Sequence, residues 1–266
     1  MRDPGLNGTI FRQKSLICLR IVVILDDTVM SLAVCDALLR SKGNISALSA
    51  QAVRSMQSIG RVYPHRGFGG RFRQWLFEYD PKPYNSWGNG AAMRISGCGF
   101  AASSLEEVKM FSRLVTEITH NHPEGIKGAE ATAVSVYLAR TGKSISEIRD
   151  YITEYYYPLD FTLDSIRAEY AFDVSCQGSV PQALEAFFES TSFEDAIRNA
   201  ISIGGDSDTI AAITGGIAEA YYGVPDNIRK KATKSLDVLL FRVLEDFERE
   251  YPTEVKTADV NQTSLS

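Results

Sequence analysis

Two short acidic segments, about 180 positions apart, carry the residue types best suited to metal chemistry. One reads DDT at positions 26–28, and the other reads GGDSDT at positions 204–209. Asp, Ser and Thr in such places also serve as ordinary helix caps, so capping is the alternative interpretation. A cap needs only one side chain, however, whereas each segment stacks two acids. The Gly-Gly pair before Asp206 also permits a backbone conformation that can aim both following carboxylates at one point.

Four carboxylates gathered at one place would repel one another strongly unless a cation joined them. Carboxylate and hydroxyl oxygens are hard ligands, which suit Mg²⁺, Mn²⁺ or Ca²⁺ and not zinc. If the two segments meet in the fold, the sequence therefore predicts a divalent-metal site.

Two further segments have the composition of ligand-binding loops. In SWGNGAAMR at 86–94, the glycines on either side of Asn89 predict a tight loop whose backbone N–H groups cradle a phosphate, although Asn-Gly is also a plain turn. The segment THNHPE at 119–124 holds two of the three histidines of the chain. This pair is compatible with a transition metal, with hydrogen bonds to an anionic ligand, or with ordinary loop polarity. Because no third ligand accompanies it, we favour ligand contact or a structural role.

The elements that must position these residues are predicted to be helices. Apolar residues recur at helical spacing, Ser-x-x-acid patterns mark helix starts at Ser104, Ser144 and Ser192, and Pro123 starts another helix. The predicted helices cover about 28–40, 104–119, 123–141, 144–157, 181–190, 192–202 and 227–250.

A further helix, DTIAAITGGIAEAYY at 208–222, is unusual because two adjacent glycines lie in its interior. Each costs about 1 kcal/mol relative to Ala, so we expect a neighbouring helix to approach closely there. Alternating strands and domain-linker composition are almost absent from the sequence. The fold class predicted is all-α: a single-domain orthogonal helical bundle around this buried small-residue helix, with a metal cleft at helix N-termini.

Composition excludes several classes of protein. Hydrophobic residues make up 44% and charged residues 23% of 266 positions, which is typical of a globular chain. The net charge of −5 lacks the signature of a general nucleic-acid-binding surface, and no run approaches the roughly 20 apolar residues of a membrane span. The four cysteines, at 18, 35, 98 and 176, are isolated, which favours reduced core thiols and a cytoplasmic location.

Taken together, four segments resemble the ADP-ribosylglycohydrolase family, the group that includes the dinitrogenase-reductase-activating glycohydrolase. They occur in the order of that family, and the resemblance covers about residues 25 to 250. The matching segments are DDTVMSLAVCDALL (26–39), SWGNGAAMR (86–94), THNHPEGIKGAEATA (119–133) and GGDSDTIAAITGGIAEAYYG (204–223).

The resemblance implies an all-α fold and a centre of two Mg²⁺ or Mn²⁺ ions. It also implies hydrolysis of an N- or O-glycosidic bond between ADP-ribose and an acceptor on a protein, a nucleic acid or a small molecule. It assigns no single catalytic residue, and it leaves the acceptor, the choice of Mg²⁺ or Mn²⁺ and the oligomeric state open. By matching position, the resemblance assigns metal binding to Asp26, Asp27, Asp206, Asp208 and Thr209, and ADP-ribose binding to Ser86, Trp87, Gly88, Asn89, Gly90 and His120.

The sequence departs from the family pattern at its N-terminus. Members typically carry a G-D-x-x-G-S-x-x-E segment about 30 residues before the Asp pair, and nothing in residues 1–25 resembles it. They also place a Thr directly before the two aspartates, where this chain has Leu25. We therefore expect an atypical segment at 1–24, a helical domain at 25–252 and a polar tail at 253–266, with at least one metal incompletely coordinated.

These departures leave other interpretations of the function open. One alternative is an ADP-ribose-binding pseudoenzyme that has lost catalysis through its N-terminal departure. Another is a structural protein in which the same bundle persists without a ligand.

Overall fold

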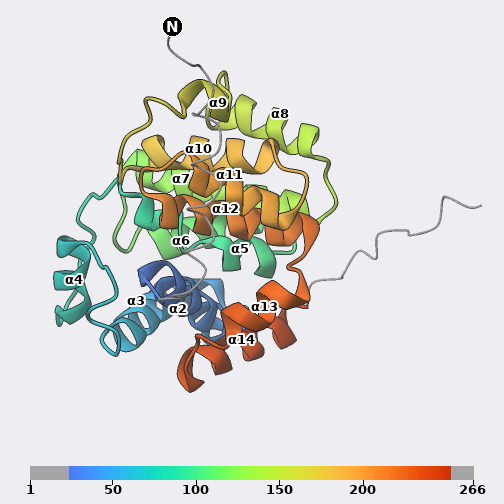
Figure 1. Ribbon diagram of the computed structural model, residues 1–266. Coiled ribbons are helices and arrows are strands. Elements are labelled where there is room, and N and C mark those ends of the chain that lie inside the picture. The colour runs from blue at the N-terminus through green and yellow to red at the C-terminus, as the bar shows by residue number, and fades with distance from the viewer. Residues whose placement is uncertain (1–23, 253–266) are drawn as a thin grey trace, which may run out of the picture.

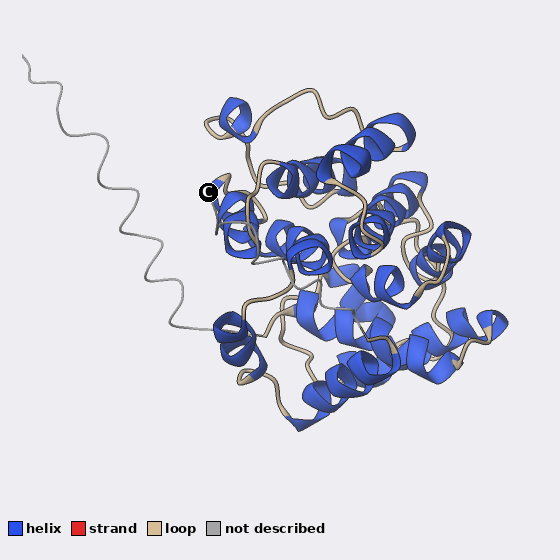
Figure 2. Cartoon of the chain, turned by 90° about the vertical axis from the view of Figure 1, so that its right-hand side faces the viewer, coloured by secondary structure: helices blue, strands red, loops and turns tan. Residues whose placement is uncertain are grey.

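A computed structural model of the chain describes residues 24–252. Within this range the chain forms α-helices and one short 3₁₀ turn but no β-strand, which confirms the all-α prediction (Figure 2). The two predicted terminal segments, 1–24 and 253–266, lie outside the described residues except for Ile24. The elements are α2 (Asp26–Ser41), α3 (Ile45–Gly60), α4 (Gly70–Phe77), η2 (Asn89–Ala91), α5 (Ser96–Ala101), α6 (Leu105–Thr116), α7 (Pro123–Arg140), α8 (Ile145–Tyr155), α9 (Leu163–Ile166), α10 (Cys176–Phe188), α11 (Phe193–Ser202), α12 (Ser207–Tyr222), α13 (Asp226–Thr233) and α14 (Val238–Glu250).

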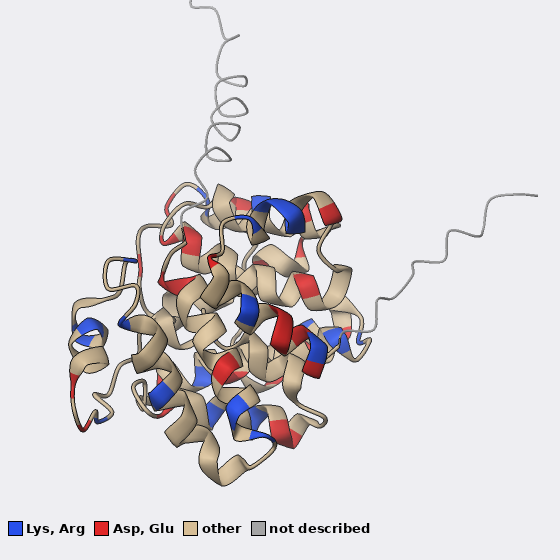
Figure 3. Cartoon of the chain, turned by 90° about the horizontal axis from the view of Figure 1, so that it is seen from below, with Lys and Arg blue, Asp and Glu red and all other residues tan. Residues whose placement is uncertain are grey.

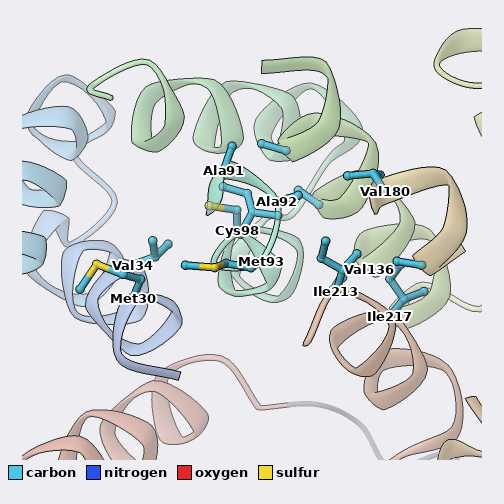
Figure 4. Close-up of a cluster of buried hydrophobic side chains, with 14 of the residues drawn as sticks. Met30, Val34, Ala91, Ala92, Met93, Cys98, Val136, Val180, Ile213 and Ile217 are labelled. Atoms are coloured by element: carbon cyan, nitrogen blue, oxygen red, sulfur yellow. The ribbon is translucent and has the colours of Figure 1, made fainter. Parts of the chain in front are cut away.

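The small-residue helix α12 lies in the middle of the bundle, against α7, α10 and α11 (Figure 1). Its inward face buries Ile210, Ile213 and Ile217, and Figure 4 shows the last two within the central cluster of apolar side chains. A Cβ added at Gly216 would lie only 2.8 Å from Cβ of Ser96 in α5. This close approach of α5 explains one of the two adjacent glycines.

Helix α2 carries the first acidic segment into the same core. Its residues Val29, Met30 and Ala33 are fully buried, and it packs against α3, α5 and α14. Figure 4 shows the Met30 side chain pointing away from Met93 and Cys98, and Cε of Met30 would lie 3.2 Å from a Cβ added at Gly60 of α3. The packing of α2 and α12 into one core therefore fixes where their first residues lie.

The three predicted Ser-capped helix starts are present. Ser104, Ser144 and Ser192 each accept a hydrogen bond from the backbone N–H three residues later. The backbone N–H of Ser144 in turn donates to the carboxylate of Glu147, which completes a capping box. At the other two starts the acidic side chain accepts from the N–H of the residue before the Ser instead. The capping pattern thus places each start to within one residue.

Two predicted helices have different bounds in the structure. The range 227–250 is divided into α13 and α14 by a break at residues 234–237, where Asp237 accepts hydrogen bonds from the N–H groups of Leu239 and Leu240. Helix α10 begins five residues before Pro181, because Ser175 caps it. Proline has no N–H, so α10 gives up one internal hydrogen bond at Pro181 and continues.

A cavity of about 820 Å³ lies among α2, α5, α12, α13 and α14. Its wall is mostly apolar, and it extends from Asp27 to an acidic pair formed by Glu219 and Glu248. Burial and repulsion by Glu248 raise the pKa of Glu219 to about 7, while Arg229 opposes the shift. The face of α12 that carries Ala212, Gly216 and Glu219 therefore lines this cavity.

The remaining features of the surface and the thiols are ordinary. Acidic and basic residues are interspersed over the face shown in Figure 3. Cys35, Cys98 and Cys176 are buried free thiols, as expected for these three, and Cys18 lies outside the described residues. Between residues 24 and 252, no helix has both the length and the apolar character needed to cross a membrane.

The contact of α5 with α7 gives a first test of the packing. A Cβ added at Gly99 would lie 2.6 Å from both the carbonyl oxygen of Ala133 and Cβ of Val136. We expect Gly99→Ala to lower the free energy of unfolding by about 2 kcal/mol in urea denaturation, because neither neighbour can move freely. Gly70→Ala is the control, since nothing lies within 4 Å of its added Cβ. Equal stability of the two variants would contradict this packing.

Candidate functional site

The first turns of α2 and α12 lie side by side, although about 180 positions separate them in the sequence. Oγ1 of Thr209 donates a hydrogen bond of 3.0 Å to Oδ1 of Asp27, and both residues are buried. The structure therefore brings the two acidic segments together at one place in the fold.

The acidic side chains in these two turns are not used as helix caps. The N-cap position of α2 is Leu25, and that of α12 is Asp206, and neither side chain accepts a capping hydrogen bond. Asp26, Asp27 and Asp208 lie within the first turns, where the positive end of the helix dipole favours a carboxylate. The capping interpretation is thus wrong for these residues, and their oxygens need another explanation.

The glycine pair before α12 has the conformation expected from the sequence. Gly204 and Gly205 have φ values of +76° and +66°, in the left-handed region. A Cβ at Gly205 would also lie 2.4 Å from Cε1 of Tyr170. The glycine pair makes a tight turn next to the ring of Tyr170, and this turn places Asp206 beside the start of α2.

Burial, with a smaller contribution from crowding, raises the pKa values of these carboxylates. Burial, with repulsion by Asp26 and Asp208, raises the pKa of Asp27 to about 7. Burial raises the pKa of Asp26 to about 6, and repulsion by Asp208 and Asp206 adds to the shift. The pKa of Asp206 is also raised by burial. The folded chain therefore concentrates negative charge at this place at the expense of stability.

The donor set fits a hard divalent cation in chemical type and charge. Asp26, Asp27, Asp206, Asp208 and Thr209 offer only oxygen atoms, and a cation would offset both the burial and the mutual repulsion of the carboxylates. Within residues 24–252, no three His, Cys, Asp or Glu side chains already converge on one point as a metal site does. Binding would therefore have to draw the carboxylates closer together.

The raised pKa of Asp27 leads to a prediction about stability without divalent cations. Because the pKa of Asp27 is higher in the folded chain than its ordinary value of 3.8, the folded state keeps a proton that the unfolded state has lost. The contribution of Asp27 to the free energy of unfolding is therefore largest below about pH 4, and it falls as the pH rises to about 7. We expect Asp27→Asn to raise the free energy of unfolding at pH 8 by about 1–3 kcal/mol in urea with a chelator present.

The control is Asp150→Asn on α8, which removes an exposed carboxylate and should leave stability unchanged at both pH values. At pH 4 the Asp27→Asn variant and the parent chain should have similar stability. A variant that is less stable than the parent at pH 8 would show that the charged form of Asp27 does not destabilise the fold.

The loop 86–90 lies beside this acidic cluster. Nδ2 of Asn89 donates to Oδ2 of Asp206 at 2.7 Å and to Oγ of Ser179 at 2.9 Å. Two backbone N–H groups that we expected to face an anion instead donate within the protein, that of Gly88 to Ser86 Oγ and that of Asn89 to the carbonyl oxygen of Val174. The side chain of Asn89 thus connects the loop to the acids. Fewer backbone N–H groups of the loop are available to an anion than the sequence suggested.

Trp87 and Gly90 complete the loop. The Trp87 side chain is 51% exposed, and its ring packs edge-on against His122 at a centroid distance of 5.4 Å. Its carbonyl oxygen accepts a hydrogen bond from the N–H of Cys176 at the start of α10. The loop is therefore anchored through its backbone while the indole remains open to solvent.

The two histidines have different surroundings. Nδ1 of His122 accepts from the N–H of Glu124 and caps α7. His120 is buried against the glycines of the loop, since a Cβ at Gly90 would lie 3.5 Å from its Nε2. Burial and the nearby Arg94 hold the pKa of His120 well below its usual value, so its ring is neutral. The structure thus gives His122 a capping role and places His120 beside the loop.

Sequence reasoning missed three polar side chains that support this site. Ser179 on α10 accepts from Asn89, and Arg94 and Thr119 contact His120. Ser179 had no distinguishing pattern of its own, and Thr119 was noted only as the first residue of the THNHPE segment. The signal for Arg94 was its place in the SWGNGAAMR segment, where an Arg among small and apolar residues has to be buried.

Comparisons with known proteins all find similarity to proteins named as hydrolases of ADP-ribose linkages. A sequence model of the family described as ADP-ribosylglycohydrolase matches residues 9–257 of the chain. The ADP-ribosylhydrolase ARH3 of Homo sapiens is 29% identical over 285 residues, covering 84% of this chain and 75% of that protein. The Bos taurus protein of the same name is also 29% identical, covering 84% and 74%.

Two further similarities come from a bacterial protein and a solved structure. The ADP-ribosylarginine hydrolase Tri1 of Pseudomonas putida is 27% identical over 157 residues, covering 56% of this chain and 42% of that protein. A solved structure titled "ADP-ribosylglycohydrolase-related protein complex" superposes with a TM-score of 0.62, covering 86% of this chain and 82% of that one. Its sequence identity of 20% supports the likeness of fold alone.

Proposed function

The chain belongs to the ADP-ribosylglycohydrolase family, and on this premise we propose that it hydrolyses the glycosidic bond between ADP-ribose and an acceptor, with Mg²⁺ or Mn²⁺ as cofactor. The observation that carries the proposal is the meeting of two acidic helix starts whose carboxylates are not used as caps. The proposed metal ligands are Asp26, Asp27, Asp206, Asp208 and Thr209, and the proposed ADP-ribose contacts are Ser86, Trp87, Gly88, Asn89, Gly90 and His120.

The electrostatics favour a cation-dependent site over a structural one. A carboxylate cluster that raises its own pKa values costs stability, as the shifts of Asp26 and Asp27 indicate. Such a cost is typical of functional sites, where residues are arranged for binding or chemistry and not for stability. When bound, a divalent cation would hold the ribose hydroxyls and offset the charge of the carboxylates.

The residues of the loop would bind the rest of the substrate. Loop 86–90 lies next to the acids, because Asn89 bonds Asp206 directly, and His120 lies against Gly88 and Gly90 of the loop. The exposed indole of Trp87 offers a flat apolar surface for an aromatic base. The ring nitrogen Nε2 of His120, which lies next to Gly90, suits a diphosphate. ADP-ribose contains both groups and a ribose between the diphosphate and the scissile bond.

In the reaction, the bond between C1 of the ribose and the acceptor breaks, the oxygen of water bonds to C1, and a proton from water passes to the acceptor. A carboxylate of the cluster would orient the attacking water. The negative charge of the cluster would also stabilise the positive charge that develops at C1 in the transition state. No single carboxylate is assigned to either role.

The proposal is tested by incubating the full-length protein with peptides ADP-ribosylated on Ser or on Arg, and with ADP-ribosylated nucleic acid. Free ADP-ribose is measured with Mg²⁺, with Mn²⁺ and with a chelator. We expect release from at least one acceptor, dependent on a divalent cation. The acceptor that is cleaved would also identify the substrate class.

Two results would overturn the proposal. Release that is equal with metal and with chelator would contradict a metal-dependent mechanism. ADP-ribose binding without release from any acceptor, measured with both metals, would replace the hydrolase with an ADP-ribose-binding protein.

A further inference from the structure

A buried arginine lies behind the histidine of the candidate site. Arg94 is only 1% exposed, and its guanidinium lies over the ring of Phe72 at 5.5 Å. Nη2 of Arg94 donates to Oγ1 of Thr119 at 2.7 Å and lies 3.5 Å from Nδ1 of His120. In the part of the chain that the structure describes, Nε of Arg94 has no hydrogen-bond partner. Burying this cation is costly, which indicates a role beyond packing.

The direction of the hydrogen bonds around Thr119 follows from the chemistry of the groups. A guanidinium can only donate, so Oγ1 of Thr119 accepts from Arg94. The single hydroxyl hydrogen of Thr119 must then go to another acceptor. His120 Nδ1 lies at 2.7 Å, a full-strength distance, whereas the carbonyl oxygen of Thr116 lies at 3.4 Å. The hydroxyl therefore donates to Nδ1.

An accepting Nδ1 fixes the tautomer of the imidazole. The ring is neutral, as its lowered pKa indicates, so it carries one proton, and with Nδ1 as acceptor that proton is on Nε2. A proton on Nδ1 would also point toward the guanidinium of Arg94, which disfavours it. The ring thus presents an N–H donor on the side away from Arg94.

That donor faces the glycines of the loop. A Cβ would lie 3.5 Å from Nε2 if added at Gly90 and 3.7 Å if added at Gly88. Both hydrogen bonds of the ring within the described residues involve Nδ1. Nε2 is therefore available to a ligand that lies against the loop.

We propose that Arg94 and Thr119 are positioning residues, which hold His120 as a neutral Nε2–H donor to an anionic oxygen of the ligand bound at loop 86–90. The identity of that ligand, the diphosphate of ADP-ribose, rests on the proposed function. The fixed tautomer itself does not, because it follows from contacts within the chain.

The tautomer is measured first, on the ligand-free protein, by nitrogen-15 NMR of the histidine side chains. The chain has only three histidines, and His120→Gln assigns the signals of His120. We expect Nε2 of His120 to be protonated and Nδ1 unprotonated at pH 7. A proton on Nδ1, or on both nitrogens, would overturn the inference.

Arg94→Met then tests what fixes the tautomer. Without the guanidinium, the hydroxyl of Thr119 is free to accept from His120 and to donate toward Thr116. We expect a mixture of the two tautomers in this variant. An unchanged Nε2–H tautomer would show that Arg94 does not set it.

Binding of ADP-ribose in the presence of Mg²⁺, measured by calorimetry, tests the consequence and also covers the case in which Arg94→Met does not fold. We expect Thr119→Val to raise the Kd about tenfold and Thr119→Ser to restore it to within about twofold. The matched control is Thr116→Val, which removes another buried hydroxyl, one with no partner among residues 24–252. Equal effects of the two valine variants would reduce Thr119 to a packing role.

The outcomes separate this inference from the proposed function. If the parent chain shows the Nε2–H tautomer but binds no ADP-ribose with either metal, the proposed function fails and only the internal arrangement stands. If it binds ADP-ribose with His120 protonated on Nδ1, the proposed function stands and this inference fails.

Discussion

Asp208→Ala is expected to abolish metal-dependent release of ADP-ribose, lowering the rate by at least about 10³-fold, as removal of one member of a catalytic unit commonly does. The side chain is exposed in the first turn of α12 and faces Asp26 and Asp27 closely enough to raise their pKa values. Its loss should remove both a metal ligand and part of the repulsion. Release is measured with saturating Mn²⁺, and stability by thermal denaturation with and without the metal.

The control for this variant is Glu106→Ala, which removes an exposed acid from the first turn of another helix, α6. Both substitutions cost a favourable interaction with a helix dipole, worth roughly 0.3–1 kcal/mol. We expect only Asp208→Ala to lose the stabilisation by metal. If Asp208→Ala lowers the melting temperature while metal affinity is unchanged, the carboxylate serves the helix and not a cation.

Leu25→Thr is expected to improve metal binding, lowering the Mn²⁺ concentration for half-maximal stabilisation about tenfold, equivalent to about 1.4 kcal/mol. Leu25 is the N-cap residue of α2, with an extended backbone at φ −106° and ψ 179°, and it offers no side-chain oxygen. A Thr there has a backbone that suits a capping hydroxyl and places an oxygen next to Asp26. We expect the rate of ADP-ribose release to rise with metal affinity.

Leu25→Val is the matched control, because Val has the shape of Thr without its oxygen. A gain shared by both variants would be a packing effect. A gain in stability with Thr that is the same with Mn²⁺ and with chelator would show that the hydroxyl only caps α2, and it would contradict a role for this position at the metal.

Many of the helices were predictable because their end signals are local, but α3, α4, α5 and α9 were not among those predicted. A Ser three residues before an acid defines a start through two hydrogen bonds within one turn, and the structure contains all three such starts. The break between α13 and α14 was not predicted, because apolar residues keep helical spacing across it. Asp237 divides the two helices. It caps α14, and its carboxylate also accepts a hydrogen bond from the hydroxyl of Tyr63, which is distant in the sequence.

The acidic segments of the site could be found from composition, because four carboxylates beside glycines and hydroxyls are a rare pattern. Their supporting residues could not. Ser179, Thr119 and Arg94 act through contacts with Asn89 and His120 that only the packed fold creates. The backbone N–H groups of loop 86–90 were expected to face an anion, and this was also misjudged. The N–H of Asn89 donates to the carbonyl oxygen of Val174, which lies about 85 positions away in the sequence.

Other expectations from the sequence stay predictions. The absent G-D-x-x-G-S-x-x-E segment and the division at residue 24 concern positions outside the described residues. The cytoplasmic location rests on the isolated cysteines, and the number of metal ions rests on the family resemblance. Each needs a measurement of its own.

The most direct test of the central claim is a thermal melt of the full-length protein with Mg²⁺ or Mn²⁺, and then with ADP-ribose added. If the acids at the starts of α2 and α12 form a cation-dependent ADP-ribose site, metal alone will raise the melting temperature and ADP-ribose will raise it further only when metal is present. No shift with either metal, alone or with ADP-ribose, would contradict the account and remove the basis for calling the protein an enzyme.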